Sequence, residues 1–242
     1  MRLHRNLVYT TIDSLNAIFN EGEYADKVVA RALKKDKRWG SSDRKFVAET
    51  IYEIVRWKRL YAEIAEVKEP FDRDNLWRMF SVWAVLRGYP IPDWRQLEGT
   101  PERKIKGRFD ELSKIRALKE SIPDWLDELG TKELDAYWGA CLEACNLPAA
   151  LVLRTNTLQT NRQTLLNNLQ KKGVQAELLG DANAILIPER SKITDLDLYQ
   201  QGHFEIQDGN SQMIAPWLQP KAGELYFDCC AGAGGKSLHL AN

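Results

Sequence analysis

The sequence is poor in the residues that build covalent or metal-bound frameworks. Among its 242 residues are four cysteines and three histidines, whereas disulfide scaffolds are typical of short chains much richer in cysteine. Cys141 and Cys145 are one helical turn apart, while Cys229 and Cys230 are adjacent. Neither spacing is that of a zinc finger, and the histidines are not spaced as metal ligands. We therefore expect no metal site.

Long hydrophobic runs are also missing. No stretch approaches the roughly 18 apolar residues that a transmembrane helix requires. Residues 1–6, Met-Arg-Leu-His-Arg-Asn, lead into a helical pattern and not into the apolar core of a signal peptide. We therefore expect a cytoplasmic, monomeric protein that has no membrane partner.

The chain has no net charge, because its 34 Lys and Arg residues balance its 34 Asp and Glu residues. The charges are unevenly distributed along the chain, since residues 31–59 contain 10 basic and 4 acidic side chains. Such a patch suits a polyanionic partner. A solvated helix face is the plainer interpretation, and charge counting alone favours it.

Residues 1–145 have the hydrophobic spacing of helices. We expect one of these helices to have Ser41 or Ser42 as its N-cap and to continue until Glu69-Pro70 stops it. Ser121 is expected to cap a later helix that has Pro123 in its first turn. Cys141 and Cys145 lie on an apolar face of the last helix, and we predict that both are core residues.

Residues 146–208 change to a mixed pattern. Short apolar runs predict strands at 150–154, 174–179, 184–187 and 204–207. A capping-box pattern at 160–163 predicts the start of a helix, which Gly173 ends. The sequence therefore predicts a small α+β module, too short for a large core of its own.

A glycine-rich turn follows a further predicted strand at 224–228. Residues 228–237 are Asp-Cys-Cys-Ala-Gly-Ala-Gly-Gly-Lys-Ser and open a helix, an arrangement that presents backbone N–H groups to a ligand. A phosphate-binding P-loop requires glycine where Cys230 stands, and a dinucleotide fingerprint requires glycine or alanine where Ser237 stands. The remaining class is the S-adenosylmethionine loop of methyltransferases. An ordinary tight turn is the alternative, although so many glycines and alanines leave little for packing.

Residues 228–237 resemble the first cofactor motif of the RsmB/Sun family of RNA cytosine-C5 methyltransferases, usually Asp-Ala-Cys-Ala-Ala-Pro-Gly-Gly-Lys-Thr. Cys229, Gly232 and Ala233 depart from that motif, and the loss of its proline should loosen the loop. Two upstream segments are similar to the family's Gly-x-Phe-x-Val-Gln-Asp-x-Ser-Ser-Gln and Leu-Arg-Val-Asn, and a third looks like part of a NusB-type RNA-binding domain. These segments are residues 202–212, 153–156 and 43–47.

The resemblance implies a multidomain chain. Residues 1–145 would form an all-α, NusB-like RNA-binding domain, and residues 146–208 a small α+β, RRM-like module. Residues 209–242 would be the truncated start of a Rossmann-like α/β methyltransferase domain.

The resemblance also implies a substrate RNA, expected to be ribosomal, and the cofactor S-adenosylmethionine. The cofactor contacts would be Cys230, Ala231, Gly232, Ala233, Gly234, Gly235 and Lys236. The RNA contacts would be Lys34, Lys35, Lys37, Arg38, Arg44, Lys45, Arg154 and Asn156. Trp39 is a candidate for stacking on a base. For Arg154 and Asn156, local hydrogen bonding at a strand end is an equal alternative.

Family chemistry needs a cysteine thiolate that adds to carbon 6 of cytosine, so that carbon 5 can attack the sulfonium methyl group. A base then removes the proton from carbon 5, and the cysteine leaves. The resemblance places that nucleophile and a second, releasing cysteine on later strands, beyond Asn242, so we expect no catalytic residue in this chain and no activity from it alone. Cys230 is predicted to line the cofactor pocket, and Cys229 to be a small buried hydrophobe.

Two alternatives stay open. The chain could be an RNA-binding module with a vestigial cofactor loop and no catalysis. It could also be part of a methyltransferase that acts on proteins or small molecules, although an RNA-binding front domain argues against that class.

Overall fold

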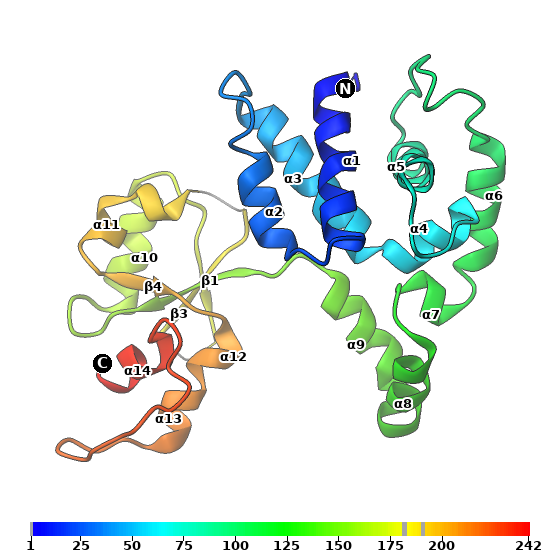
Figure 1. Cartoon of the computed structure of the whole chain (residues 1–242). Helices are drawn as coiled ribbons and strands as arrows, with labels where there is room; N and C mark the ends of the chain where they lie inside the picture. The colour runs from blue at the N-terminus through cyan, green and yellow to red at the C-terminus, as the bar shows by residue number, and fades with distance from the viewer. Residues whose placement is uncertain (1, 181–182, 190–191) are drawn as a thin grey trace. The chain divides into compact units, whose positions relative to one another are not determined.

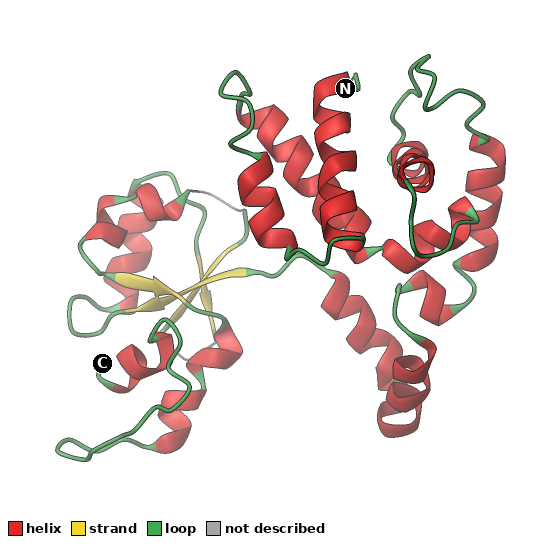
Figure 2. Cartoon of the chain, viewed as in Figure 1, coloured by secondary structure: helices red, strands yellow, loops and turns green. Residues whose placement is uncertain are grey.

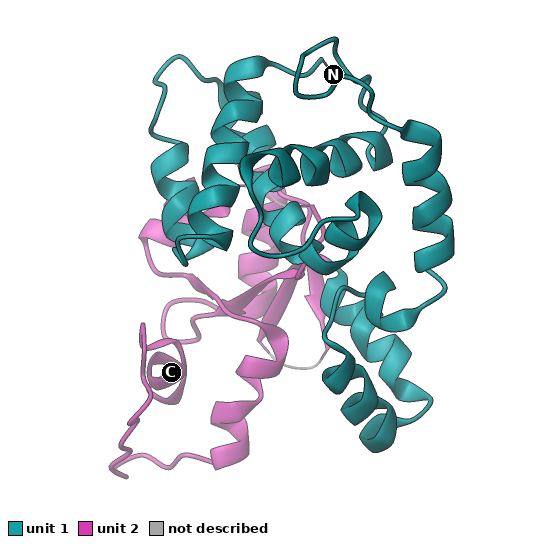
Figure 3. Ribbon diagram, turned by 45° about the vertical axis from the view of Figure 1, so that its right-hand side comes forward, with its two compact units in different colours: residues 1–147 teal, residues 148–242 magenta. Residues whose placement is uncertain are grey.

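The chain folds as two units that are divided in sequence between Leu147 and Pro148, coloured separately in Figure 3. The computed structural model describes residues 2–180, 183–189 and 192–242. The first unit is helical, and the second contains a small antiparallel sheet with short helices (Figure 2).

The first unit has its helices in the following order (Figure 1). They are α1 (Arg5–Phe19), α2 (Ala25–Ala32), α3 (Ser41–Arg56), α4 (Lys58–Ala65), α5 (Arg73–Leu86), α6 (Glu102–Leu112), α7 (Arg116–Lys119), α8 (Asp124–Leu134) and α9 (Tyr137–Asn146). The expected helical character of this region is confirmed.

Helix α5 is the centre of the first unit. Nine of its 14 residues are buried, from Leu76 to Val85, so it has almost no solvent face. A helix that is apolar nearly all round is stable only when other elements cover it. Helices α1, α4 and α6 pack against it, and the Asp72 carboxylate caps its start by accepting a hydrogen bond from the N–H of Asn75 at 2.7 Å. Within the described residues, no helix combines the length and hydrophobicity needed to cross a membrane.

The long helix expected from Ser41 to Glu69 is wrong, because it breaks at Trp57 into α3 and α4. The hydroxyl of Ser121 accepts a hydrogen bond from the N–H of Arg59, which lies in the first turn of α4, at 3.1 Å. Ser121 therefore caps α4 and not the helix that follows it, whose N-cap is Pro123. A contact between residues so far apart in sequence leaves no local signal.

Two other expected details of this unit are corrected. The N-cap of α3 is Gly40, and the Asp43 carboxylate accepts a hydrogen bond from its N–H at 3.1 Å, so Ser41 is the first helical residue. Cys145 is exposed and Cys141 is only partly buried, because the buried face of α9 is limited to Leu142.

The second unit is built on a four-stranded sheet of order β2-β3-β1-β4, all neighbours antiparallel. Its elements are β1 (Leu151–Thr155), α10 (Arg162–Lys171), β2 (Glu177–Leu179), β3 (Ala184–Ile187), η1 (Ile193–Asp195), α11 (Asp197–Gln200), β4 (Phe204–Ile206), α12 (Gly209–Gln212), α13 (Ile214–Leu218) and α14 (Gly235–Leu240). The order βαββαβ is a recognised unit in which helices cover one side of the sheet. The expected α+β module is confirmed.

The core of this sheet is made by the buried side chains of Leu153, Ile185 and Phe204, which pack with Leu165 and Leu169 of α10. Leu153 of the central strand β1 pairs in register with Ile185 of β3. The N-cap of α10 is Asn161, whose carboxamide oxygen accepts from the N–H of Thr164 at 2.8 Å. The cap therefore lies one residue later than the predicted capping box.

Two predicted strands differ from the structure. Only Glu177–Leu179 of the predicted strand at 174–179 pairs with a neighbour. Residues 224–228 form no strand, and Leu225 and Phe227 are 99% and 91% exposed. A strand exists only when a neighbour completes its ladder, and no described residue pairs with this segment.

The hairpin of α8 and α9 provides a test of this packing. Gly130 of α8 lies against the Trp138 ring, and a Cβ atom at this position would overlap the ring. We expect Gly130→Ala to lower the free energy of unfolding by about 1–3 kcal/mol, the usual cost of overpacking. Urea unfolding followed by circular dichroism measures the change.

Gly139→Ala on α9 is the matched control, because a Cβ there meets nothing within 4 Å. Alanine is the better helix former by about 1 kcal/mol, so this variant should be at least as stable as the wild type. Equal stability of the two variants would contradict the close approach of Trp138 to α8.

Candidate functional site

The glycine-rich loop, residues 228–237, connects the extended segment at 224–228 with α14. Gly232 and Gly234 have φ values of +55° and +82°, a region that residues with a Cβ atom rarely adopt. A Cβ at Gly234 would meet no atom within 4 Å, and one at Gly232 only the carbonyl oxygen of Cys230 at 4.0 Å. The two glycines are therefore required by the backbone conformation and not by lack of space.

The carboxylate of Asp228 joins the two ends of this loop. One oxygen accepts a hydrogen bond from the N–H of Cys230 at 3.1 Å, and the other accepts from the hydroxyl of Ser237 at 2.6 Å. The Ser237 bond, followed by the Cys230 bond, lowers the pKa of Asp228, and the charge of Lys236 adds to this effect. The loop is thus closed by its own hydrogen bonds.

Three consecutive backbone N–H groups in this loop, those of Ala231, Gly232 and Ala233, donate to no acceptor in the described part of the chain. All three residues are exposed. Consecutive free N–H groups in a turn form a concave site that attracts an anionic group. The loop can therefore receive a carboxylate or a similar anion.

A second segment is tied to the loop from the end of β4. The carboxamide nitrogen of Gln207 donates to the carbonyl oxygen of Gly235 at 3.3 Å, and that of Gln212 donates to the carbonyl oxygen of Gln207 at 3.0 Å. The side-chain oxygens of both glutamines are buried and have no donor among the described residues. Sequence reasoning did not assign these two residues to the site, although both lie in the motif at 202–212.

Both cysteines of the loop are exposed, and their sulfur atoms are 3.9 Å apart. The prediction that Cys229 is a small buried hydrophobe is wrong, because the segment before it is not covered by a sheet. Among the described residues, no group of three or more His, Cys, Asp or Glu side chains is placed to hold a metal ion.

The six predicted RNA contacts of the first unit lie between α2 and the second turn of α3. Lys34 and Lys37 are exposed and have no acidic partner in the described structure. Three others form ion pairs: Lys35 with Asp13 at 3.3 Å, Arg38 with Asp36 at 2.6 Å, and Lys45 with Glu49 at 3.8 Å. The hydrogen bonds from Arg38 lower the pKa of Asp36 to about 2.

Two residues of this segment serve the fold. The guanidinium of Arg44 is partly buried and donates to the carbonyl oxygens of Trp39 and Leu33, so it shapes the connection between α2 and α3. Trp39 is only 7% exposed and belongs to the core. The stacking role considered for Trp39 is therefore wrong, because its ring faces are covered by other apolar side chains.

Of the two predicted RNA contacts of the second unit, Arg154 is buried and Asn156 forms local hydrogen bonds. Arg154 is 2% exposed within β1, opposite Glu205 of β4, and burial lowers its pKa while Glu205 raises it. Its Nε atom has no acceptor among the described residues. The carboxamide of Asn156 donates to the carbonyl oxygen of Gly202 at 2.8 Å and accepts from the N–H of Leu158 at 3.1 Å.

Known proteins share parts of this sequence. Residues 122–194 match the family model of the RsmF/B-like methyltransferase, ferredoxin-like domain. The chain is 33% identical over 159 residues to the ribosomal RNA small subunit methyltransferase B of Vibrio vulnificus, a match that covers 65% of this chain and 34% of that protein. It is 35% identical over 157 residues to the probable ribosomal RNA small subunit methyltransferase B of Bacillus subtilis, covering 60% of this chain and 32% of that protein.

A longer match joins the chain to the corresponding probable enzyme of Synechocystis, at 25% identity over 98% of this chain and 60% of that protein. The crystal structure of PH0851 has a TM-score of 0.69 at 19% identity, covering 100% of this chain and 61% of that one; this likeness concerns the fold alone. The matched regions span about a third of the first two relatives. The resemblance to the RsmB/Sun family is confirmed, and the matching family model describes the domain at 122–194 as ferredoxin-like.

The closure of the loop by Asp228 predicts a pH dependence. Because the folded pKa of Asp228 is lowered, the closing bonds are present above the ordinary aspartate pKa and are lost only as pH falls through the lowered value. We expect the Cys230 amide resonance to titrate, in a nuclear magnetic resonance experiment, at a pH below the ordinary aspartate range.

Ser237→Ala removes the hydrogen bond that contributes most to the lowered pKa of Asp228. In this variant the titration midpoint of Asp228 should therefore move up toward the ordinary aspartate value. Ser237→Thr keeps a hydroxyl and is the control, with a midpoint that stays low. Identical midpoints for the Ala and Thr variants would show that Ser237 does not close the loop.

Proposed function

With these relatives as the premise, we propose that the chain forms part of an S-adenosylmethionine-dependent RNA cytosine-C5 methyltransferase that acts on ribosomal RNA. The observation that carries the proposal is the loop at 228–237, which joins the motif of such enzymes to free N–H groups held in place by Asp228. The names of the relatives, ribosomal RNA small subunit methyltransferase B, support RNA as the substrate class.

The residues of the loop fit the proposed cofactor. We assign its contacts to the segment Cys230, Ala231, Gly232, Ala233, Gly234, Gly235 and Lys236. The free N–H groups of Ala231, Gly232 and Ala233 suit the carboxylate of an amino-acid-like group, and the glycines allow such a group to approach the backbone. The cofactor supplies the electrophilic methyl group of the reaction, and this chain contributes binding and orientation.

The nucleophile is assigned to a cysteine other than the four in this chain. Cys141 and Cys145 lie on α9 of the helical unit, and Cys229 and Cys230 lie in the loop assigned to the cofactor. A nucleophile must reach carbon 6 of the cytosine while carbon 5 faces the methyl group. A residue that wraps the methionine end of the cofactor is poorly placed for that attack.

The parts of the chain take the following roles in this proposal. Residues 1–145 are a NusB-like domain that binds RNA through Lys34, Lys35, Lys37, Arg38, Arg44 and Lys45, and residues 146–208 are an RRM-like module. Residues 209–242 are the beginning of the methyltransferase domain. Arg154 and Asn156 are kept as the weakest RNA contacts, because their polar atoms are buried or bonded within the second unit.

A second candidate function is an RNA-binding module without catalysis. The observation that favours it is the exposed segment at 224–228, which forms no strand before the loop. Binding of S-adenosylmethionine by the chain, measured by calorimetry, favours the enzyme over this alternative.

RNA binding by the chain should be electrostatic. We expect its affinity for structured ribosomal RNA to fall as salt rises, because cations released from the RNA are replaced by Lys and Arg side chains. Reversing Lys34, Lys35 and Arg38 to Glu should weaken binding at least about tenfold, because each phosphate contact contributes to the salt-dependent term. Fluorescence anisotropy at several salt concentrations measures both effects.

The matched control reverses Arg103, Lys106 and Lys114 to Glu, since these cations of the α6 region are exposed and form no ion pair in the described structure. Circular dichroism should show both variants folded. If the two triple variants bind RNA equally, the contact surface lies outside the segment at 34–38.

The assignment of the cysteines is tested with RNA that carries 5-fluorocytidine, which blocks removal of the carbon-5 substituent and traps a covalent adduct. We expect this chain to form no adduct, even with saturating S-adenosylmethionine, because none of its four cysteines is the nucleophile. Mass spectrometry of the peptides is the measurement. An adduct on Cys229 or Cys230 would overturn this role assignment.

A further inference from the structure

The first unit contains a cavity of about 720 Å³ that none of the proposed roles uses. It lies between α5 and α6, beneath the connection at 95–101, and Tyr9 of α1 forms part of its wall. A volume in this range is typical of sites for small ligands and single nucleotides.

The wall of this cavity carries more cations than anions. Its basic side chains are Arg73, Arg78, Arg95 and Lys104, and its acidic side chains are Glu66, Asp74 and Glu98. Lys104 pairs with Glu66, and Arg73 pairs with Asp13 at 2.9 Å. Arg78 and Arg95 are exposed and form no ion pair among the described residues, and the carboxylates of Asp74 and Glu98 on the same wall form none either. Two guanidinium groups are therefore free to bind an anion.

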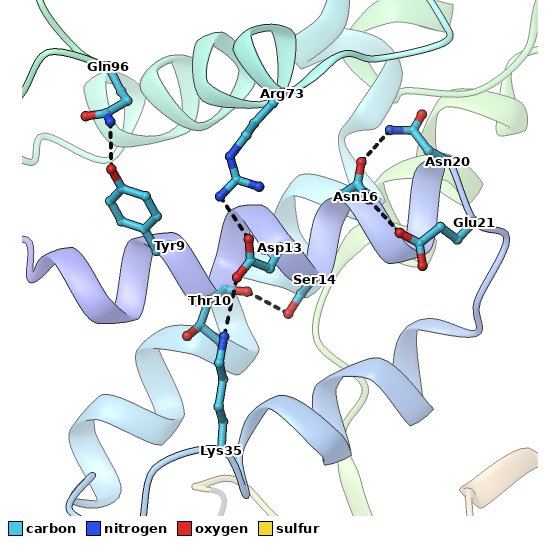
Figure 4. Close-up of polar contacts among 10 residues, drawn as sticks. All are labelled: Tyr9, Thr10, Asp13, Ser14, Asn16, Asn20, Glu21, Lys35, Arg73 and Gln96. Carbon is cyan, nitrogen blue, oxygen red and sulfur yellow. Dashed lines mark hydrogen bonds and ion pairs between the residues drawn. The ribbon is translucent and has the colours of Figure 1, made fainter.

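Tyr9 gives the cavity an aromatic surface that is fixed in orientation. Its ring is half-buried and makes an edge-to-face contact with Trp77, with 5.1 Å between the ring centres, and the guanidinium of Arg73 lies over the ring at 6.0 Å from its centre. The carboxamide nitrogen of Gln96 donates to its hydroxyl at 2.6 Å. In Figure 4 the Tyr9 side chain extends toward Gln96, and the Arg73 side chain extends toward Asp13. An aromatic ring held in this way can stack on a base of any type.

The cavity is connected to the basic segment through Asp13, one turn after Tyr9 on α1. The Asp13 carboxylate pairs with Arg73 on one side and with Lys35 on the other, as drawn in Figure 4. Lys35 belongs to a second hollow of about 340 Å³, which Arg31 and Lys34 also line. Lys35 and Arg73 are thus joined through Asp13, and Lys34 lies beside them with no ion pair among the described residues.

We infer that this cavity binds one unpaired nucleotide of the substrate RNA, with its base on Tyr9 and its flanking phosphates on Arg78 and Arg95. The strand continues over α1 toward Lys34 and Lys35. Sequence-tolerant stacking joined to phosphate contacts is the usual way in which proteins hold single-stranded RNA. An acidic peptide would use the same cations but would gain nothing from the aromatic ring. The inference depends on the proposed function only in taking RNA as the ligand.

The test uses the full chain and a fluorescein-labelled single-stranded RNA of about 12 nucleotides. Arg78→Gln with Arg95→Gln should weaken binding about tenfold and reduce the slope of log affinity against log salt by about 0.7 for each lost phosphate contact. The control is Arg103→Gln with Lys106→Gln, two exposed cations of α6 that line no part of this cavity. This control should bind within about twofold of the wild type.

The aromatic contact is tested separately. Tyr9→Phe keeps the ring and should bind almost as well as the wild type, whereas Tyr9→Leu should lose about tenfold, the effect of one stacked base. Because Tyr9→Leu can also disturb the packing on Trp77, the wild-type chain is irradiated with RNA that carries 4-thiouridine. We expect a crosslink to the peptide that contains Tyr9 or Trp77.

The outcomes separate this inference from the proposed function. If the wild type binds RNA, and the Arg78 and Arg95 variant and Tyr9→Leu bind equally well, the cavity is not a nucleotide site and the RNA-binding proposal still stands. If the wild type binds no RNA, the proposed function itself fails. If the variant with Arg78→Gln and Arg95→Gln loses affinity but the wild type forms no crosslink to α1 or α5, the claim that a base stacks on Tyr9 is wrong.

Discussion

The burial of α5 is the constraint on which the helical unit depends. A helix with nine buried residues in 14 has no stable position in water, so other helices must surround it. That requirement places α1, α4 and α6 around α5. The polar residues at the start of α5, among them Arg73 and Arg78, are then left at the rim of a cavity that these helices enclose. The same burial that stabilises the unit therefore places Arg73 and Arg78 at the wall of the cavity.

The sequence predicted the helical character of the first unit and the α+β pattern of the second, because both rest on local hydrophobic periodicity. It failed where a distant residue decides the structure. Ser121 accepts a hydrogen bond from the N–H of Arg59, 62 residues away and next to the break at Trp57, and so does not cap α8. The segment at 224–228 has strand-like residues, but its conformation depends on a neighbour that local pattern cannot supply.

The candidate site was predictable to different depths. The motif at 228–237 marked the glycine-rich turn because glycine is needed where φ is positive, as found at Gly232 and Gly234. The hydrogen bonds of Asp228 and the contact of Gln207 with Gly235 depend on three-dimensional arrangement. Trp39 was assigned wrongly from the sequence. An aromatic residue beside cations resembles a base-stacking residue in sequence, but in the structure Trp39 is a core residue.

The two candidate surfaces differ in how ready they are to bind. Asp228 closes the glycine-rich loop at 228–237, so the free N–H groups of this loop are arranged in advance and a ligand bound there would cost little ordering entropy. The basic segment is less available than its composition suggests, because Lys35, Arg38, Arg44 and Lys45 already contact partners within the unit. Lys34 and Lys37 are the free cations among the six. Two contacts give only a shallow salt dependence, so under the proposed RNA-binding role further cations are needed, and in the inference above this part is assigned to Arg78 and Arg95.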